Sequence, residues 1–361
     1  MSGASFWRTA AALAFYLAIA AGTAAGGPPP LPEPRANLVL LARPTTSGAE
    51  WLAVFGIGPE KTWDAIRNNA YRWRRGDAGW QTLPPVPGGQ GRLAAQGAVA
   101  GGAFWLLGGY TVAADGSEVS TPEVWKIEPE RTPPWQRAAT MPVAVDDAVL
   151  LTYDDRYLYL ISGWHDTGNV NLVQVFDTRE GVWTQAEPWP GAPVFGAAGA
   201  LLDNDLVICG GAKIEYRPRA ARRFVTSDEC WRGTIRDGDL RRLDWQPLPP
   251  MPGGPRYRAA AEALADGGAR HAVFVGGTGH PYNYNGIGYD GTPSHPTTAV
   301  VAYDLDDGRW TCHTPLAAPR MDLRSAVVAG GRLWIAGGMD EQQAVRDEVL
   351  AYRLSTPRTC E

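Results

Sequence analysis

The sequence predicts an all-β fold, a six-bladed β-propeller in which each blade is a four-stranded antiparallel sheet. Three observations support this prediction. Short β-rich runs end in paired glycines, and 43 glycines and 30 prolines punctuate the chain. A tryptophan-bearing run also recurs at intervals of about fifty to sixty-five residues, which is the length of one propeller blade with loops. The tryptophans that mark this recurrence are Trp80, Trp135, Trp183, Trp245 and Trp310.

The N-terminal part of the chain is expected to precede the propeller. Residues 1–25 carry Arg8, a short apolar run from Ala10 to Ala21 and small residues after it, a pattern typical of a secretory signal peptide. The apolar run is shorter than a membrane span, which favours cleavage over retention as an anchor. Residues 26–36 contain PPPLPEP and are expected to form an extended spacer. Residues 37–361 then form the propeller, and we expect it in the periplasm or secreted from a bacterial cell.

Each repeat unit is predicted to place its four strands in the same order. The second strand ends at the glycine pair, where backbones crowd as the strand leaves the sheet. The fourth strand begins at the tryptophan, which plugs the space between blades, and the following Leu-Pro-Pro or Met-Pro stops it. The second-strand runs are WLAVFGIG (51–58, a weaker version), AFWLLGGY (103–110), YLYLISGW (157–164), DLVICGGA (205–212), HAVFVGGT (271–278) and RLWIAGGM (332–339).

The last unit has no tryptophan-bearing fourth strand before the chain stops at Glu361. Either the tail STPRTCE or an N-terminal segment such as Asn37 to Ala42 is expected to complete it. A closed ring is favoured over a linear array or a pair of β-sandwiches, because closure removes exposed sheet edges.

This arrangement resembles the kelch repeat, a family known for β-propellers. The resemblance covers about residue 37 to the C-terminus in six units. Departures are the missing glycine doublet in the first unit and Ser162-Gly163 in the third.

The four cysteines allow three disulfide pairings. None forms a CxxC pair, so export and disulfides fit better than a metal cluster. The repeat places Cys209 and Cys230 on neighbouring strands, which favours their pairing. Cys312 and Cys360 would then pair and attach the C-terminus to the fifth blade.

Two long insertions between second and third strands lie in adjacent units. The unit-four insertion (212–229) is rich in arginine, and the unit-five insertion carries tyrosines, amides and Asp290. Aromatic rings, amides and arginines suit an acidic sugar or a similar carboxylate ligand, although such loops also pack on themselves. The expected ligand-binding residues at this mouth of the central channel are Tyr282, Asn283, Tyr284, Asn285, Tyr289, Asp290, His165, Arg258 and Arg324.

The stretch GGAKIEYR (210–217) is similar to a motif of bacterial sialic acid mutarotases, which are exported six-bladed kelch proteins. The resemblance implies proton transfer by a glutamate and binding by an arginine six residues later. Arg217 matches the arginine, but Gly211 occupies the position of the glutamate. Glu215 is the nearby substitute, so Glu215 and Arg217 are the candidate catalytic pair.

Several function classes are disfavoured. A net charge of −5 argues against nucleic acid as a partner. The five histidines lack metal-ligand spacing, so we expect neither a metal nor another cofactor, and a copper oxidase of the galactose oxidase type is disfavoured. No membrane insertion is expected after signal cleavage. The prediction is a binding module for a sugar or another small polar ligand, with a sugar mutarotase or epimerase and a protein-interaction scaffold as alternatives.

Overall fold

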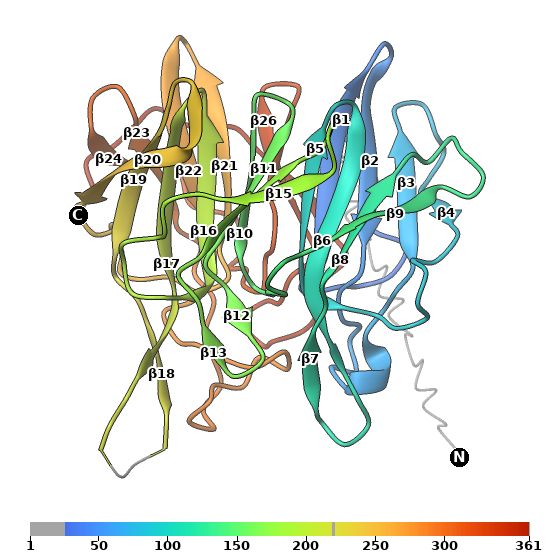
Figure 1. Ribbon diagram of the computed structural model, residues 1–361, viewed down its shortest axis with the longest axis horizontal. Coiled ribbons are helices and arrows are strands. Elements are labelled where there is room, and N and C mark those ends of the chain that lie inside the picture. The colour runs from blue at the N-terminus through green and yellow to red at the C-terminus, as the bar shows by residue number, and fades with distance from the viewer. Residues whose placement is uncertain (1–25, 219–220, 361) are drawn as a thin grey trace, which may run out of the picture.

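The computed structural model describes residues 26–218 and 221–360, and the expected signal peptide lies outside them. Six antiparallel sheets stand around a central axis, so the predicted six-bladed β-propeller is confirmed. Figure 1 views the ring from the side, with most strands running vertically. In the described residues, the helical content is one 3-10 turn, η1 (Trp63–Ala65).

The strands follow the predicted order from the axis outward, each hydrogen-bonded to its neighbour in sequence. The first three blades are β1 (Val39–Thr45), β2 (Gly48–Val54), β3 (Ala70–Arg74) and β4 (Gln81–Leu83); β5 (Leu93–Ala100), β6 (Ala103–Val112), β8 (Glu123–Ile127) and β9 (Trp135–Thr140); β10 (Val149–Tyr153), β11 (Tyr157–Ile161), β14 (Val173–Asp177) and β15 (Val182–Gln185).

The last three blades continue this pattern. They are β16 (Phe195–Leu202), β17 (Asp205–Glu215), β19 (Cys230–Arg236) and β20 (Asp239–Leu248); β21 (Ala260–Asp266), β22 (Ala269–Val275), β23 (Val300–Asp304) and β24 (Arg309–Cys312); and β25 (Val327–Ala329), β26 (Arg332–Ala336) and β27 (Val349–Tyr352). Short strands β7 (Glu118–Ser120) and β18 (Arg223–Thr226) extend β6 and β17 into hairpins, and β12 (Trp164–His165) pairs with β13 (Gly168–Asn169).

A ring of backbone hydrogen bonds joins the blades near the axis. One residue at the start of each blade adopts a left-handed conformation, and its N–H generally donates to the equivalent carbonyl of the preceding blade, as Gly196 does to Asp147 (2.7 Å). The N–H of Asn37 donates to the Asp322 carbonyl (2.9 Å) and closes the ring between the last and first blades. The left-handed conformation costs a non-glycine residue about 1 kcal/mol or more. The hydrogen bonds between the blades hold these residues in that conformation. The six residues are Asn37, Ala94, Asp147, Gly196, Arg258 and Asp322.

The outer tryptophans also join neighbouring blades. Trp135 donates its indole N–H to the Pro84 carbonyl (2.9 Å), and Trp310 donates to Pro249 (2.9 Å), so each reaches the proline turn of the preceding unit. Trp80 of the first blade makes the equivalent bond to Pro29 (3.0 Å). The proline-rich segment therefore takes the place of a proline turn.

The segment expected to be an extended spacer thus differs from that expectation in its described part. Leu31 and Arg35 are buried, and their N–H groups donate to the carbonyls of Asp347 and Arg346 beside the sixth blade. Apolar contact around Trp334 and hydrogen bonding to the last blade hold the segment against the propeller.

Neither segment expected to complete the sixth blade does so. Residues 37–42 lead into β1 of the first blade, and the tail pairs with the fifth blade, where Cys312 and Arg358 exchange backbone hydrogen bonds (3.0 and 2.9 Å). The sixth sheet has three strands in the part of the chain that is described. The ring closes through inner strands and the proline segment rather than through a shared outer strand.

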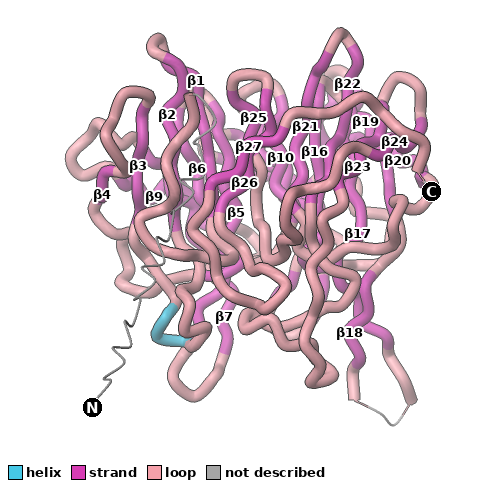
Figure 2. Tube along the Cα trace, turned by 180° about the vertical axis from the view of Figure 1, so that it is seen from behind, coloured by secondary structure: helices cyan, strands magenta, loops and turns pink. Residues whose placement is uncertain are grey.

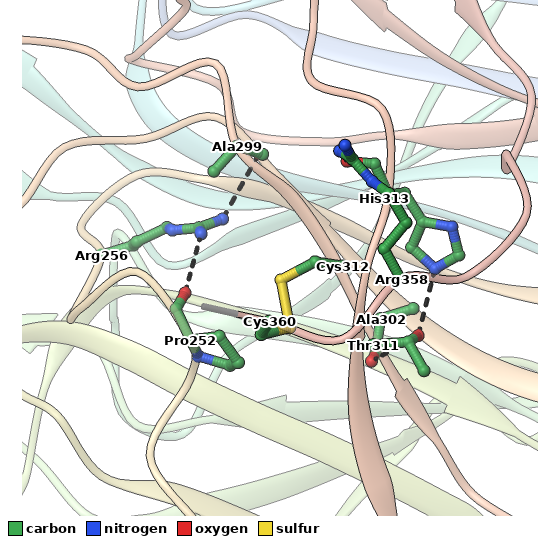
Figure 3. Close-up of a disulfide and its surroundings, with 9 residues drawn as sticks. All are labelled: Pro252, Arg256, Ala299, Ala302, Thr311, Cys312, His313, Arg358 and Cys360. Atoms are coloured by element: carbon green, nitrogen blue, oxygen red, sulfur yellow. Dashed lines mark hydrogen bonds between the residues drawn. A yellow bond between two sulfur atoms is a disulfide. The ribbon is translucent and has the colours of Figure 1, made fainter.

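Both disulfides join the predicted cysteines. Cys209 and Cys230 are directly opposite each other on β17 and β19 and are buried. Cys312 and Cys360 attach the tail to β24 (Figure 3), and the Arg358 guanidinium also donates to the His313 carbonyl (2.9 Å).

The two faces of the ring differ in their loops. The β6–β7 and β17–β18 hairpins and the β12–β13 pair project from one face, which we call the mouth face, at the bottom of Figures 1 and 2. The opposite face, the far face, carries the short turns within each blade, such as the β1–β2 turn. Within the described residues, no helix is long and apolar enough to cross a membrane.

Candidate functional site

A cavity of about 200 Å³ opens at the mouth face, and we call it the mouth pocket. Five aromatic rings form much of its wall, and ionisable groups lie among them. Residues from four consecutive blades contribute to it. The lining residues are Tyr110, Glu118, Asp146, Asp147, Trp164, Phe195, Arg222, Phe224, Arg258, Asn283 and Tyr289.

The base of the pocket is a cluster of ion pairs, which we call the ion cluster. It is formed mainly by side chains of the left-handed residues at the starts of the blades. Arg258 pairs with Asp147 (Nη2 to Oδ2, 2.7 Å) and with Asp322 (Nη1 to Oδ1, 3.0 Å), and each of these side chains is at most 2% exposed. Arg324 lies on the other side of Asp147 (Nη1 to Oδ1, 2.5 Å). Burial alone would raise the pKa of Asp147, but Arg258 and Arg324 together hold it below its usual value. The Arg258 guanidinium is therefore committed to internal carboxylates.

Two carboxyl groups in the pocket wall have no cation of their own in the described structure. Burial raises the pKa of Asp146 well above its usual value, and negative charge on Asp147 and Glu118 adds to this effect. The Ser120 hydroxyl donates to Asp146 (2.6 Å) and offsets part of it. Partial burial of its carboxyl likewise raises the pKa of Glu118, although the residue as a whole remains exposed at the rim. Burial therefore favours the protonated form of Asp146, which can donate a hydrogen bond.

The aromatic wall comes from the second to the fifth blades, with Phe224 and Tyr289 supplied by the two long insertions. The rings of Phe224 and Tyr289 are in contact, tilted by 37° with centroids 4.3 Å apart. Trp164 and Phe224 both pack near Phe195, with ring centroids 5.6 Å from it. The Arg222 guanidinium lies 5.5 Å from the Trp164 ring and donates to the Thr167 carbonyl. Unlike Arg258, it has no carboxylate partner in the described structure, so it is the cation at the pocket rim that can accept a ligand anion.

The unit-five insertion is held by its own side chains. His280 lies between Ser294 (Nδ1 to Oγ, 3.1 Å) and Asp290 (Nε2 to Oδ2, 3.0 Å), and its ring packs on the bare Cα of Gly288. This is a serine–histidine–aspartate arrangement, but Ser294 is fully buried, so its hydroxyl cannot reach a substrate. These three side chains therefore hold the unit-five insertion in one conformation.

The structure brings together only some of the predicted ligand-binding residues. Asn283, Tyr289 and Arg258 line the mouth pocket. Tyr282 is fully buried against Tyr257, with ring centroids 5.3 Å apart.

The remaining predicted ligand-binding residues have other contacts. Tyr284 packs on the core around the channel, and Asn285 accepts from the Ile287 N–H within a turn. His165 contacts the Ala144 carbonyl through Nδ1, and Arg324 lies behind the ion cluster. Asp290 accepts a hydrogen bond from the Thr292 N–H and is hydrogen-bonded to the His280 ring.

The candidate catalytic pair lies outside the mouth pocket. Glu215 and Arg217 are exposed on the β17–β18 hairpin and pair with each other (2.6 Å). The β17–β18 hairpin that carries them projects from the mouth face (Figure 1), whereas Arg222 on its returning arm lines the pocket.

Sequence reasoning did not assign Asp146, Glu118, Trp164, Phe195 or Phe224 to the site. For Asp146 a signal exists, because Asp146-Asp147 is an acidic doublet just before an apolar inner strand. The three aromatic residues carry no distinguishing signal, because aromatic side chains in β-rich runs usually belong to a core.

In the described chain, no three histidine, cysteine or acidic side chains come together in a metal-binding group. The mouth pocket itself offers a buried carboxyl, a rim guanidinium and aromatic faces.

The fold and this pocket define a class, a six-bladed propeller with a ligand-sized cavity at its loop-rich mouth. No protein-family model matches the chain. It is 25% identical to "Kelch-like protein terF" from Aspergillus terreus over 295 residues, which covers 77% of this chain and 58% of that protein. It is also 25% identical to "Putative F-box/kelch-repeat protein At4g11770" from Arabidopsis thaliana over 125 residues, which covers 34% of this chain and 30% of that one. The chain thus spans less than two thirds of both.

Among solved structures, the chain is similar to YjhT, with a TM-score of 0.72 and 17% identity, covering 92% of this chain and 99% of that one. At this identity the likeness concerns the fold. The resemblance to kelch-repeat propellers that the sequence predicted is confirmed.

Proposed function

We propose that this protein is an exported binding propeller that takes a small acidic sugar, or a ligand of similar shape and charge, in the mouth pocket. The observation that carries the proposal is the Arg222 guanidinium, which has no carboxylate partner among the described residues and lies beside aromatic rings in one cavity. Aromatic faces cover the apolar patches of a sugar ring, and a guanidinium binds a carboxylate through two parallel hydrogen bonds. A volume of about 200 Å³ suits a single ring-sized ligand.

The polar groups of the pocket match the hydroxyls of such a ligand. Asp146 donates a proton in its neutral form, whereas Asn283 can both donate and accept. Glu118 at the rim accepts hydrogen bonds when ionised and disfavours a second negative group nearby. The expected ligand therefore carries one carboxylate, placed at Arg222, and several hydroxyls.

Binding can be tested by titrating a panel of acidic and neutral monosaccharides into the protein and its variants by NMR. Arg222→Ala should weaken binding of the acidic sugar by about tenfold or more, the usual effect of losing a charged hydrogen bond. Arg217→Ala is the matched control, because it removes an arginine from the same hairpin outside the pocket. Equal affinity for acidic and neutral sugars, or equal effects of the two variants, contradicts the proposal.

A second candidate is mutarotation of a sugar in the same pocket, favoured by the Asp146 carboxyl, whose pKa is raised by burial. Anomer exchange needs a group that gives a proton to the ring oxygen and a group that removes one from the anomeric hydroxyl. Asp146 can give the proton and Glu118 can accept one, whereas Glu215 and Arg217 lie outside the pocket.

This candidate is tested by following the approach to anomeric equilibrium of N-acetylneuraminic acid by NMR. Wild-type protein should accelerate the exchange, and Asp146→Asn should slow it by about a hundredfold, within the usual range for general acid–base catalysis. Glu215→Gln is the control and should keep the rate. No acceleration by wild-type protein rejects mutarotation of this sugar and leaves the binding proposal in place.

Localisation outside the cytoplasm is part of the proposal. Two disulfides join four cysteines, and such bonds persist in oxidising compartments. A protein bound at the mouth face, through the projecting hairpins, is the alternative partner. If a protein is the partner, mouth-face variants outside the pocket, such as Tyr216→Ala, should reduce its binding.

A further inference from the structure

A second cavity adjoins the mouth pocket, and we call it the loop cleft. It measures about 210 Å³, close to the volume of the mouth pocket. One wall is strand β18, which projects from the mouth face in Figure 1, and the other is the unit-five insertion. The lining residues are 222–226 on the first wall and 279–281, Tyr289 and Asp290 on the second. The two long insertions therefore enclose a space that a single sugar ring in the mouth pocket does not use.

The loop cleft shares a boundary with the mouth pocket. Arg222, Phe224 and Tyr289 line both cavities, so these three side chains form that boundary. Burial raises the pKa of the Tyr289 hydroxyl, and Arg258 at the pocket base is the first of the charges that act on it, yet 44% of the residue is exposed. The hydroxyl end of Tyr289 therefore lies toward the mouth pocket, while other parts of the side chain face solvent.

Hydrogen bonds hold the two walls of the loop cleft in place. The Thr226 hydroxyl donates to the Gly279 carbonyl (2.7 Å) and links β18 to the unit-five insertion. On one side, β18 pairs with β17 along its length, and on the other, His280 is hydrogen-bonded to Asp290 (3.0 Å). The cleft is therefore formed before a ligand binds, which reduces the entropic cost of binding.

The walls of the loop cleft mix polar and apolar groups. Val225 and the ring of Phe224 offer apolar surface, whereas Arg223 and Asp290 carry exposed charges of opposite sign. Two opposite charges favour neither an anion nor a cation, but both groups can form hydrogen bonds with hydroxyls. The cleft is also open to solvent, and sugar hydroxyls that face water need no partner in the protein. These properties match a neutral sugar ring.

The position of Arg222 determines how a ligand can span the boundary. Its guanidinium is the proposed partner of the ligand carboxylate, and it lines both cavities. A carboxylate bound there leaves the ring of the acidic sugar in the mouth pocket and places the neighbouring substituents of that ring at the boundary. A second sugar linked close to the carboxylate therefore enters the loop cleft.

We propose that the loop cleft binds the second sugar of a larger ligand, in which an acidic sugar is linked to a neutral one. The acidic sugar occupies the mouth pocket, so this inference rests on the function proposed above. The neutral sugar packs against Phe224 and Tyr289 and forms hydrogen bonds with Arg223 and Asp290. The protein thus recognises the acidic end of a glycan rather than a free monosaccharide.

The test compares disaccharides with the methyl glycosides of their acidic sugars, by NMR titration of the full chain. The disaccharides are N-acetylneuraminic acid α-linked to galactose and glucuronic acid β-linked to N-acetylglucosamine, and each methyl glycoside has the same anomeric configuration as its disaccharide. At least one disaccharide should bind about tenfold or more tightly than its methyl glycoside. Arg222→Ala should weaken binding of both members of that pair, because it removes the partner of the shared carboxylate.

Two variants test whether this gain in affinity comes from the loop cleft. Gly279→Leu fills the cleft, and the fold accommodates it because a Cβ there meets nothing closer than the Pro255 carbonyl at 3.6 Å. It should reduce the affinity for the disaccharide to that for the methyl glycoside. Arg223→Ala removes a hydrogen-bonding group without filling the cleft and should reduce the gain as well. Gly168→Leu on β13 is the matched control, because a Cβ there meets nothing within 4 Å and the residue lines neither cavity, so the gain should persist.

The outcomes separate this inference from the function on which it rests. If the methyl glycosides bind but neither disaccharide binds more tightly, the loop cleft is not a sugar site and the mouth-pocket proposal stands. The inference is also overturned if Gly279→Leu keeps the gain. If no ligand of either pair binds, both the inference and the binding of these acidic sugars in the mouth pocket are rejected.

Discussion

The two long insertions of the fourth and fifth blades occupy equivalent places between second and third strands, yet they are built differently. The unit-four insertion continues β17 into a hairpin with β18, and most of its side chains face solvent. The unit-five insertion buries Tyr282 and Ser294 completely and is fixed through His280. One insertion is an exposed hairpin, and the other is a packed loop.

This difference shows which polar residues remain available to a ligand. Most polar groups of the unit-five loop bind one another, so a sequence rich in tyrosine, asparagine and aspartate mainly stabilises the loop itself. The hairpin has fewer internal partners, and its returning arm delivers Arg222 and Phe224 to the pocket. We therefore expect substitutions in the loop to affect stability and substitutions in the hairpin to affect binding.

The largest expected effect tests the packing of the unit-five loop. Tyr282→Ala removes a fully buried ring from contact with Tyr257 and should lower the free energy of unfolding by about 3–5 kcal/mol. Urea denaturation followed by tryptophan fluorescence measures it. A loss below about 1 kcal/mol would mean that the loop is not part of the core.

The second effect concerns the base of the unit-four hairpin. Replacing Cys209 and Cys230 together by alanine removes the cross-strand disulfide and should cost about 2–4 kcal/mol. The measurement is the difference in denaturation midpoint between this double variant and wild type under non-reducing conditions. An unchanged midpoint would show that the β17–β19 ladder is sufficient without the bond.

A smaller effect, dependent on pH, is expected at Asp290. Hydrogen bonds from Thr292, together with His280, lower the pKa of this carboxyl to about 2. A lowered folded-state pKa stabilises the protein above the unfolded value of about 4, and this contribution is lost as pH falls toward 2. Asp290→Asn should therefore lower the unfolding temperature at pH 6 but have little effect at pH 2. A difference that is constant with pH would contradict ionisation as its cause.

The smallest effect is expected at the exposed tip of the hairpin. Glu215 and Arg217 pair at 2.6 Å, but both are roughly half exposed, and such pairs contribute little. Arg217→Ala should change the free energy of unfolding by less than about 0.5 kcal/mol. A loss above about 1 kcal/mol would mean that the hairpin contributes to stability as the loop does.

Much of the fold was predictable because its cause is local and repeated. Trp80, Trp135 and Trp310 make the same bond in their own units, and glycine pairs recur at the same strand end, so several weak signals reinforce one another. The pairing of Cys209 with Cys230 followed from the strand order. The role of PPPLPEP was missed because its equivalence to the other proline turns becomes visible only through the Trp80 bond to Pro29.

The candidate site was less predictable, since nothing in it repeats. Whether Tyr282 points into the core and Tyr289 into the pocket depends on turns within one unique loop. Asp146 and Asp147 are adjacent, yet burial raises the pKa of Asp146, whereas two arginines lower the pKa of Asp147.

The sequence by itself determined the blade number, the strand order and the disulfides, because a propeller blade buries its apolar faces through a pattern contained in each repeat. Only the tertiary structure decided where the pocket lies. Ring closure brings residues from different blades together around one axis, and their separation in sequence leaves no trace of that proximity. The same closure places Asp147 between Arg258 and Arg324 at the axis.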